Sequence, residues 1–214
     1  MSQTVFGRPV DRHFDTVEAL REEYRMPSEF VRDKEIDHID DLARRFIAAS
    51  PLAILTTRRP DGSLDVTPRG DPPGFIQVLD DKTLALPDRP GNYRMDAHEN
   101  VMRTGHIGLL FLIPGHGDTL RVRGHGAVVR DAPLSKQLAV NGRPAGLVTL
   151  IRVDQVLSHC PKAFIRSRAW QPEHWPDTSD VPTLAEMMKV HSQLAHSLEE
   201  LDDLIHTSNT DQLY

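Results

Sequence analysis

The spacing of apolar residues changes at Pro51, which separates a helical pattern from a series of extended ones. From His38 to Ser50 the apolar residues recur at steps of three and four, as on one face of a helix: Ile39, Leu42, Ala43, Phe46 and Ile47. We therefore predict a helix over 38–50, with Asp37 or Asp40 at its N-terminal end, where a carboxylate is favourable.

The residues before this helix predict only short elements. Thr16 is a suitable N-cap for a short helix that ends near Tyr24, and Ser28 can cap a further turn. Residues 1–14 show neither the helical nor the strand spacing of apolar residues and are expected to form a loosely ordered arm. They are polar and without an apolar core segment, so we do not expect a signal peptide.

After Pro51, short apolar and β-branched runs alternate with turn residues, as in an antiparallel sheet. The expected strands cover residues 52–57, 64–69, 75–79, 83–86, 107–113, 119–130 and 147–157. Helices are predicted over 92–104 and 133–140, and Gly124 and Gly126 suggest a bulge or bend in a long strand. The pattern predicts a mainly β fold with flanking helices, arranged as a small antiparallel barrel.

The C-terminal part has a helical pattern from Thr183 to Ile205, which we predict as one helix. Its apolar stripe consists mostly of Leu and Met: Leu184, Met187, Met188, Leu194, Leu198, Leu201 and Ile205. Packing of this stripe on the barrel and packing on a partner subunit are both open.

Composition excludes several classes of function. Of the 214 residues, 39% are hydrophobic and 26% are charged, with a net charge of −6 and no Lys/Arg-rich block, so nucleic-acid binding is not expected. The longest apolar run, 107–114, is too short to span a membrane. The 11 histidines lack metal-ligand spacing, and we predict no metal. A single cysteine, Cys160, suits a reducing cytoplasm.

The segment 65–115 carries the most informative chemistry. It places Arg69, Arg89 and Arg94 among Gly, Pro and Asn residues, between short apolar runs. Guanidinium forks and turn N–H groups close together are what a phosphate requires. The alternative is that these are ordinary hairpin loops whose arginines are solvated surface charges.

Three stretches of this segment carry a resemblance to a known family: DVTPRGDPPGF, LPDRPGNYRMDAHENV and HIGLLFLIPG. The chain resembles the pyridoxamine 5'-phosphate oxidase-like FMN-binding proteins over about residues 42–170. This resemblance implies a split β-barrel that forms a homodimer around two FMN molecules. It also implies three parts: an N-terminal arm with short helices (1–37), the barrel (38–170) and a C-terminal helical extension (171–214).

The resemblance further implies two cofactor-binding segments. The strand segment comprises Thr67, Pro68, Arg69 and Gly70, and the loop segment comprises Asp88, Arg89, Asn92 and Arg94. Arg89 and Arg94 are expected at the phosphate, and Arg69 at the ribityl chain or the ring edge. Asn92 is also a possible cap for the following helix, whose N–H groups would then face the phosphate.

A late segment, HCPKAFIRSRAW, is expected to reach the flavin bound mainly by the other subunit. By resemblance, Trp170 and Arg168 take this role, and Arg166 is an alternative to Arg168. The competing interpretation gives Trp170 a packing role and the arginines interface ion pairs. Cys160 follows His159 directly, and adjacent strand residues point to opposite faces, so a thiolate nucleophile is not favoured.

The sequence departs from the true oxidases of this family. Thr67 stands near their first Arg, the segment 92–94 replaces their Ser-Arg-Lys, and Thr119, a further cofactor candidate, stands where they have Gln. We therefore place the chain in a divergent branch and do not expect pyridoxamine phosphate oxidation.

The function expected from the resemblance is that of an FMN-dependent oxidoreductase, which transfers hydride or electrons to or from a small molecule. No catalytic acid or base can be identified from the sequence. The alternatives are a non-catalytic flavin-binding or storage protein and a deazaflavin-binding or haem-binding relative. Deazaflavin also presents a phosphate, whereas no axial-ligand motif for haem is evident.

Overall fold

The computed structural model describes residues 3–211 and 213–214, which divide into two compact units on either side of Lys34. The first unit contains strands β1 (Gln3–Val5) and β2 (Arg8–Val10) and helices α1 (Val17–Glu23) and α2 (Glu29–Arg32). Thr16 Oγ1 caps α1 by accepting from the Ala19 N–H, as predicted. None of the described residues of this unit is buried.

The expectation of a loosely ordered arm over 1–14 is wrong for residues 3–10, which form a hairpin. Strands β1 and β2 pair antiparallel, with Val5 opposite Arg8. The two residues between them, Phe6 and Gly7, both have positive φ (48° and 78°), as a two-residue hairpin turn requires. The sequence analysis missed this turn because Phe rarely adopts such a conformation.

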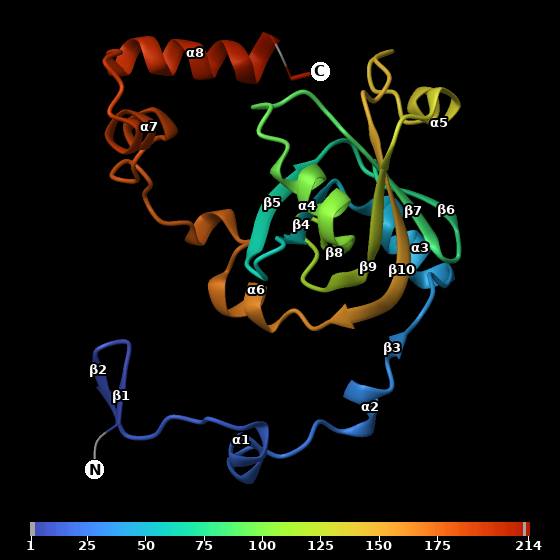
Figure 1. Ribbon diagram of the computed structural model, residues 1–214, viewed down its shortest axis with the longest axis vertical. Coiled ribbons are helices and arrows are strands. Elements are labelled where there is room, and N and C mark those ends of the chain that lie inside the picture. Colours follow the sequence, from blue (N-terminus) through green and yellow to red (C-terminus); the bar gives the residue numbers. More distant parts are fainter. Residues whose placement is uncertain (1–2, 212) are drawn as a thin grey trace. The chain divides into compact units, whose positions relative to one another are not determined.

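The second unit is built on one antiparallel sheet, which confirms the mainly β fold (Figure 1). Its strands are β3 (Glu35–Ile36), β4 (Leu52–Arg58), β5 (Leu64–Gly70), β6 (Gln77–Asp80), β7 (Thr83–Pro87), β8 (His106–Leu112), β9 (Thr119–Val129) and β10 (Val148–His159). They follow the order β5-β4-β8-β9-β10-β7-β6, and β3 pairs with β10. The hairpins β4–β5 and β6–β7 were both predicted from their turn residues.

Strand β10 contains a bulge that the glycines of β9 only partly indicated. The register shifts between Val153 and Gln155, so Asp154 has no residue opposite it on β9. Opposite the bulge, a Cβ on Gly124 would lie 1.9 Å from the carbonyl oxygen of Arg152. A glycine is therefore required at 124, because the two backbones approach too closely for any side chain.

Two helices cover the buried face of the sheet. α3 (Asp41–Ala49) begins at Asp40, whose carboxylate accepts from the Ala43 N–H, and it buries Ala43 and Ile47. α4 (Asp96–Thr104) contacts β9 and β4 and buries Ala97 and Val101. Both helices contribute to one core cluster around Phe111, Ile151 and Val122, which are 1% exposed or less.

The remaining helices lie after β9. They are α5 (Ala132–Gln137), α6 (Lys162–Ser167), the short 3-10 helix η1 (Pro172–His174), α7 (Leu184–Ser192) and α8 (Leu198–Asp211). No helix in the described ranges is both long enough and apolar enough to cross a membrane.

The single helix predicted over 183–205 is two helices in the structure. α7 ends at Gln193, which is left-handed (φ 51°). α8 begins after Ser197, which exchanges hydrogen bonds with Glu200 as in a capping box. The apolar period runs through both helices, so the Ser197–Glu200 cap was the available signal for the break.

Candidate functional site

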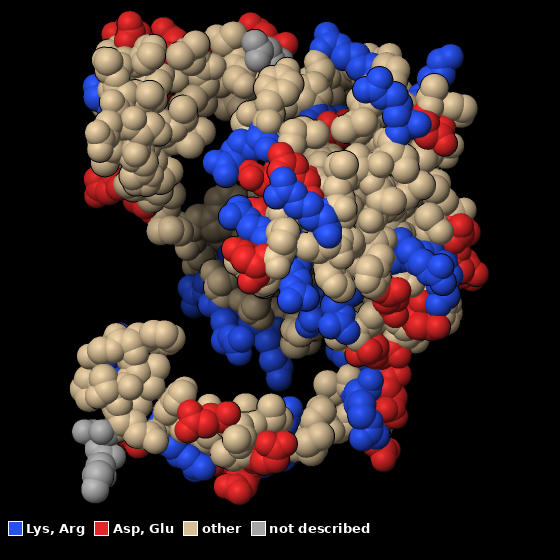
Figure 2. Space-filling model, in the orientation of Figure 1, with Lys and Arg blue, Asp and Glu red and all other residues tan. Residues whose placement is uncertain are grey.

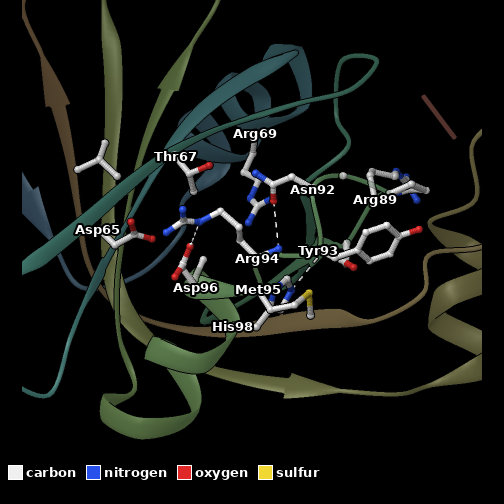
Figure 3. A pocket seen from close by; sticks show the side chains of 15 residues that line it. Asp65, Thr67, Arg69, Arg89, Asn92, Tyr93, Arg94, Met95, Asp96 and His98 are labelled. Atoms are coloured by element: carbon white, nitrogen blue, oxygen red, sulfur yellow. Dashed lines mark hydrogen bonds and ion pairs between the residues drawn. The ribbon is translucent and has the colours of Figure 1, made fainter. Parts of the chain in front are cut away.

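A cavity of about 310 Å³ lies between β5, the loop after β7 and the first turn of α4 (Figure 3). Six of the predicted cofactor residues line it: Thr67, Arg69, Asp88, Arg89, Asn92 and Arg94. Asp65, Tyr93, Met95, Asp96 and His98 line it as well. Its volume lies within the range of small-molecule sites. Figure 2 shows Lys and Arg interspersed with Asp and Glu over the face that carries α4 and β5.

The alternation of β5 explains which strand residues line the cavity. Asp65, Thr67 and Arg69 are half-buried, whereas Pro68 and Gly70 are exposed. Successive side chains of a strand point to opposite faces, so Thr67 and Arg69 share the cavity face. Pro68 and Gly70 are not brought to the cavity, and their cofactor role stays a prediction.

The loop from Asp88 to Met95 enters α4 in an unusual conformation. Tyr93 and Met95 are both left-handed (φ 57°), which is strained for residues other than glycine. The prediction that Asn92 caps the helix is wrong. Its side-chain oxygen instead accepts from the Arg94 N–H at 3.1 Å, and the N-cap position falls on Met95. Met95 offers no side-chain acceptor, so the first turn of α4 presents uncapped N–H groups beside the cavity.

Arg94 is the most accessible cation of the site, with 68% of its side chain exposed. Its Nε donates to Asp96 Oδ2 at 2.6 Å, and this bond lowers the pKa of Asp96 and raises that of Arg94. The pair is therefore charged at neutral pH. No hydrogen bond among the described residues uses the two Nη nitrogens of Arg94, which remain available to an anion.

Arg89 is held much more firmly than the sequence predicted. Its Nε donates to Asp71 Oδ2 at 2.6 Å, and its Nη2 donates to the Leu138 carbonyl at 2.7 Å. The Asp71 side chain is fully buried, and its Oδ1 accepts from the Tyr214 hydroxyl at 2.7 Å. Two of the five N–H groups of the Arg89 guanidinium thus anchor the loop, and its predicted phosphate contact rests on Nη1 and the second N–H of Nη2.

His98, in the first turn of α4, was not singled out by the sequence analysis. The residue is 8% exposed, and its Nε2 lies 3.5 Å from Asp88 Oδ1. Its Nδ1 is buried and has no hydrogen-bond partner among the described residues. Burial lowers the pKa of His98; the charge of Asp88 opposes this effect, and that of Arg69 adds to it. The imidazole is therefore neutral at pH 7.

The late predicted residues lie away from this cavity. Thr119 is buried at the start of β9, opposite His159. Trp170 stacks on Phe164, with ring centroids 5.3 Å apart, and Arg168 Nη1 lies 3.2 Å from His174 Nδ1. None of these three residues lines the cavity, and their cofactor roles stay predictions. Those of Arg168 and Trp170 refer to a flavin held by a second subunit.

Two further observations limit the chemistry of the site. Within residues 3–211 and 213–214, no three His, Cys, Asp or Glu side chains form a group that could hold a metal ion. Cys160 is exposed and does not line the cavity. Because Arg69, Arg94 and the first turn of α4 meet at one cavity, the arrangement is suited to binding an anionic organic molecule.

Comparisons with solved structures found several matches of low sequence identity. The tagged HupZ protein of Group A Streptococcus is 18% identical, with a TM-score of 0.47, and the match covers 56% of this chain and 93% of that chain. General Stress Protein 26 from Bacillus anthracis is 14% identical (TM-score 0.43; 53% and 88%). An F420 reductase is 18% identical (TM-score 0.40; 51% and 92%). A comparison with curated proteins found no match.

A comparison with protein families gave a match over most of the sheet. The family described as pyridoxamine 5'-phosphate oxidase matches residues 39–160, which is more than half of the 214 residues. The matched range begins in the approach to α3, ends after β10 and contains the whole loop 88–95. This chain belongs to the pyridoxamine 5'-phosphate oxidase family.

Proposed function

We propose that this protein is an FMN-binding flavoprotein that acts as an FMN-dependent oxidoreductase on a small molecule. The observation that carries the proposal is the meeting of Arg69, Arg94 and the uncapped first turn of α4 at one cavity. Flavin binding is common in the family to which the chain belongs. When bound, FMN supplies a ring that accepts and donates hydride, while the protein binds and orients the reactants.

The donor set fits the parts of FMN in different ways. Arg94 and the α4 N–H groups are suited to the phosphate, because they combine the unused Nη nitrogens of a guanidinium with helix-end donors. Thr67 and Arg69, on β5, are suited to the ribityl chain and the ring edge. The cavity carboxylate Asp96 is paired with Arg94, which limits its repulsion of an anion.

The first test is the absorbance spectrum of the purified protein, with mass analysis of any released cofactor. A two-band flavin spectrum and released FMN are expected. Released deazaflavin or haem would replace FMN in the proposal. A colourless protein that takes up no added FMN would refute it. Bleaching of the bound flavin by a reduced nicotinamide or another donor separates an oxidoreductase from a flavin-storage protein.

Replacing Arg94 with alanine is expected to weaken FMN binding by about 10- to 100-fold, the range for losing a hydrogen bond to a charged group. Fluorescence titration with FMN measures the change. Riboflavin, which lacks the phosphate, should bind the variant as well as it binds the wild type. The control is Arg103→Ala, which removes an exposed arginine that pairs with Glu99 within α4. Unchanged FMN affinity in Arg94→Ala would remove Arg94 from the phosphate site.

We also propose that the protein is a homodimer with FMN at the subunit interface. The proposal is supported by the family to which the chain belongs, whose members are typically homodimers. Light scattering is expected to give twice the mass of the 214-residue chain. A monomeric mass with flavin still bound would contradict the dimer.

A further inference from the structure

Tyr214 is held by side chains of the barrel at both of its polar groups. Its hydroxyl donates to Asp71 Oδ1 at 2.7 Å, and its main-chain carbonyl oxygen accepts from Arg143 Nη1. The two partners come from distant parts of the chain, because Asp71 follows β5 and Arg143 lies between α5 and β10. The barrel therefore recognises a phenol and a carbonyl group at a fixed separation.

The Asp71 end of this contact is buried and held in place. Asp71 Oδ2 accepts from Arg89 Nε at 2.6 Å, and Arg89 also donates to the Leu138 carbonyl oxygen. The other oxygen, Oδ1, has the Tyr214 hydroxyl as its hydrogen-bond partner among the described residues. A carboxylate oxygen without access to water needs a donor, so this position favours a phenol over a plain phenyl ring.

The Arg143 end is placed by a tight turn. Asn141 and Gly142 both have positive φ (52° and 75°), and the main chains of Val140 and Arg143 exchange two hydrogen bonds across them. Asn-Gly favours such a two-residue turn. Because a guanidinium binds a carboxylate more strongly than a single carbonyl oxygen, Arg143 would favour a carboxylate over the carbonyl group of Tyr214.

Open space lies beside Tyr214. A cavity of about 350 Å³ is lined by Tyr214, Arg143 and Pro144, and by four loop residues that also line the cavity at Arg94: Asp88, Arg89, Pro90 and Tyr93. The Tyr93 side chain is exposed and extends away from Arg94 (Figure 3). The prolines and the Tyr93 ring provide apolar surface on which an aromatic ring can lie.

The segment that carries Tyr214 is held by this residue. Leu213 is 57% exposed. Within 205–211 and 213–214, the hydrogen bonds of Tyr214 are the only ones that join the segment to the barrel. A segment held at one residue can leave its site while the core stays folded. The contact is therefore the closed state of an equilibrium whose open state exposes Asp71 Oδ1 and Arg143.

We propose that Asp71 and Arg143 form a binding site for a 4-hydroxyphenyl carboxylic acid, and that Tyr214 is a built-in occupant which this ligand displaces. The ligand hydroxyl replaces the Tyr214 phenol at Asp71, and the ligand carboxylate replaces the Tyr214 carbonyl group at Arg143. Such a site goes beyond the proposed flavin function and does not require it. The loop residues shared by the two cavities place the ligand beside a bound flavin.

Calorimetric titration with two acids tests the site. The acid 3-(4-hydroxyphenyl)propionate has the spacing of phenol and carbonyl carbon found in tyrosine, and 3-phenylpropionate lacks the hydroxyl. Tyr214→Ala is expected to bind the hydroxylated acid about tenfold more tightly than the wild type, or better, because the occupant is gone. The same variant should bind 3-phenylpropionate about tenfold more weakly than the hydroxylated acid, since Asp71 Oδ1 stays unpaired.

Two further variants separate the contacts. Adding Arg143→Gln to Tyr214→Ala should weaken both acids by the same factor, about tenfold, because both carry the carboxylate. Leu213→Ala changes the exposed neighbour of Tyr214 and leaves its two contacts in place, so this variant should bind both acids as the wild type does. All titrations omit FMN, so a protein that fails to bind flavin can still pass this test, and the reverse also holds.

Three results would overturn the proposal. Tyr214→Ala could bind the hydroxylated acid no better than the wild type, which would mean that Tyr214 does not occupy the site. It could bind both acids equally, which would mean that Asp71 does not recognise the hydroxyl. Should Tyr214→Ala not fold, ¹⁹F NMR of wild-type protein that contains fluorotyrosine decides. The Tyr214 signal must shift when the hydroxylated acid is added, and an unmoved signal excludes displacement.

Discussion

Replacing Asp71 with alanine is expected to lower the free energy of unfolding by about 3–5 kcal/mol, the range for breaking a buried ion pair from one side. The Asp71 side chain is 0% exposed and accepts hydrogen bonds from Arg89 and the Tyr214 hydroxyl. Alanine leaves the Arg89 guanidinium, 16% exposed, without its counter-charge. Urea unfolding followed by circular dichroism measures the loss.

Two matched variants calibrate this result. Glu99→Ala removes an exposed ion pair with Arg103 and should cost about 0.5 kcal/mol or less. Tyr214→Phe removes one of the hydrogen bonds to Asp71 and should cost about 1 kcal/mol. If Asp71→Ala were as stable as Glu99→Ala, the buried pair would not hold the loop 88–95, and Arg89 would be free for the phosphate.

Gly124→Ala is expected to destabilise the sheet by about 3 kcal/mol, at the upper end of the range for overpacking. The added Cβ would lie 1.9 Å from the Arg152 carbonyl oxygen, and the backbone atoms of Arg152 and Val153 are also close. Backbone within a ladder of hydrogen bonds cannot move aside as a side chain can. The unfolding midpoint in urea and the thermal midpoint should both fall.

Other glycines of the chain provide graded controls for this prediction. A Cβ on Gly126 would lie 2.9 Å from Val101 Cγ1, a side-chain atom that can shift, so Gly126→Ala should cost less than Gly124→Ala. A Cβ on Gly146 would meet nothing within 4 Å, and Gly146→Ala should be neutral or slightly stabilising. Equal stability of the three variants would contradict the close backbone approach at the bulge.

The sheet could be predicted from the sequence because its signals are local. The Pro-Asp-Gly-Ser turn at 60–63 fixes the β4–β5 hairpin, and the alternation of β5 places Thr67 and Arg69 on one face. The resemblance of loop 88–94 to a known family pointed to the same cavity residues that the structure brings together. Local turns and strand periods were therefore enough for the sheet, whereas the cavity residues were predicted from the family resemblance.

The remaining features depend on contacts between distant residues. Asp71 meets Arg89, Leu138 lies 49 residues beyond Arg89, and the Tyr214 hydroxyl reaches Asp71 across 143 residues. The unpaired nitrogen of His98 becomes evident only when α4 is packed on β9 and β4. The helix was predicted to begin at residue 92, but α4 begins at Asp96. Tyr93 and Met95 adopt left-handed conformations just before it, and helix propensities do not indicate such conformations.

The position of β10 in the chain has a consequence for how the protein is made. Among the described strands, β10 alone lies between β9 and β7, and its residues 148–159 are synthesised after all the other strands. A nascent chain that ends before Val148 holds Arg69 and Asp88 in two parts of the sheet that no strand joins. The cavity can therefore form only once β10 has joined these two parts, so any cofactor must bind after that strand is in place.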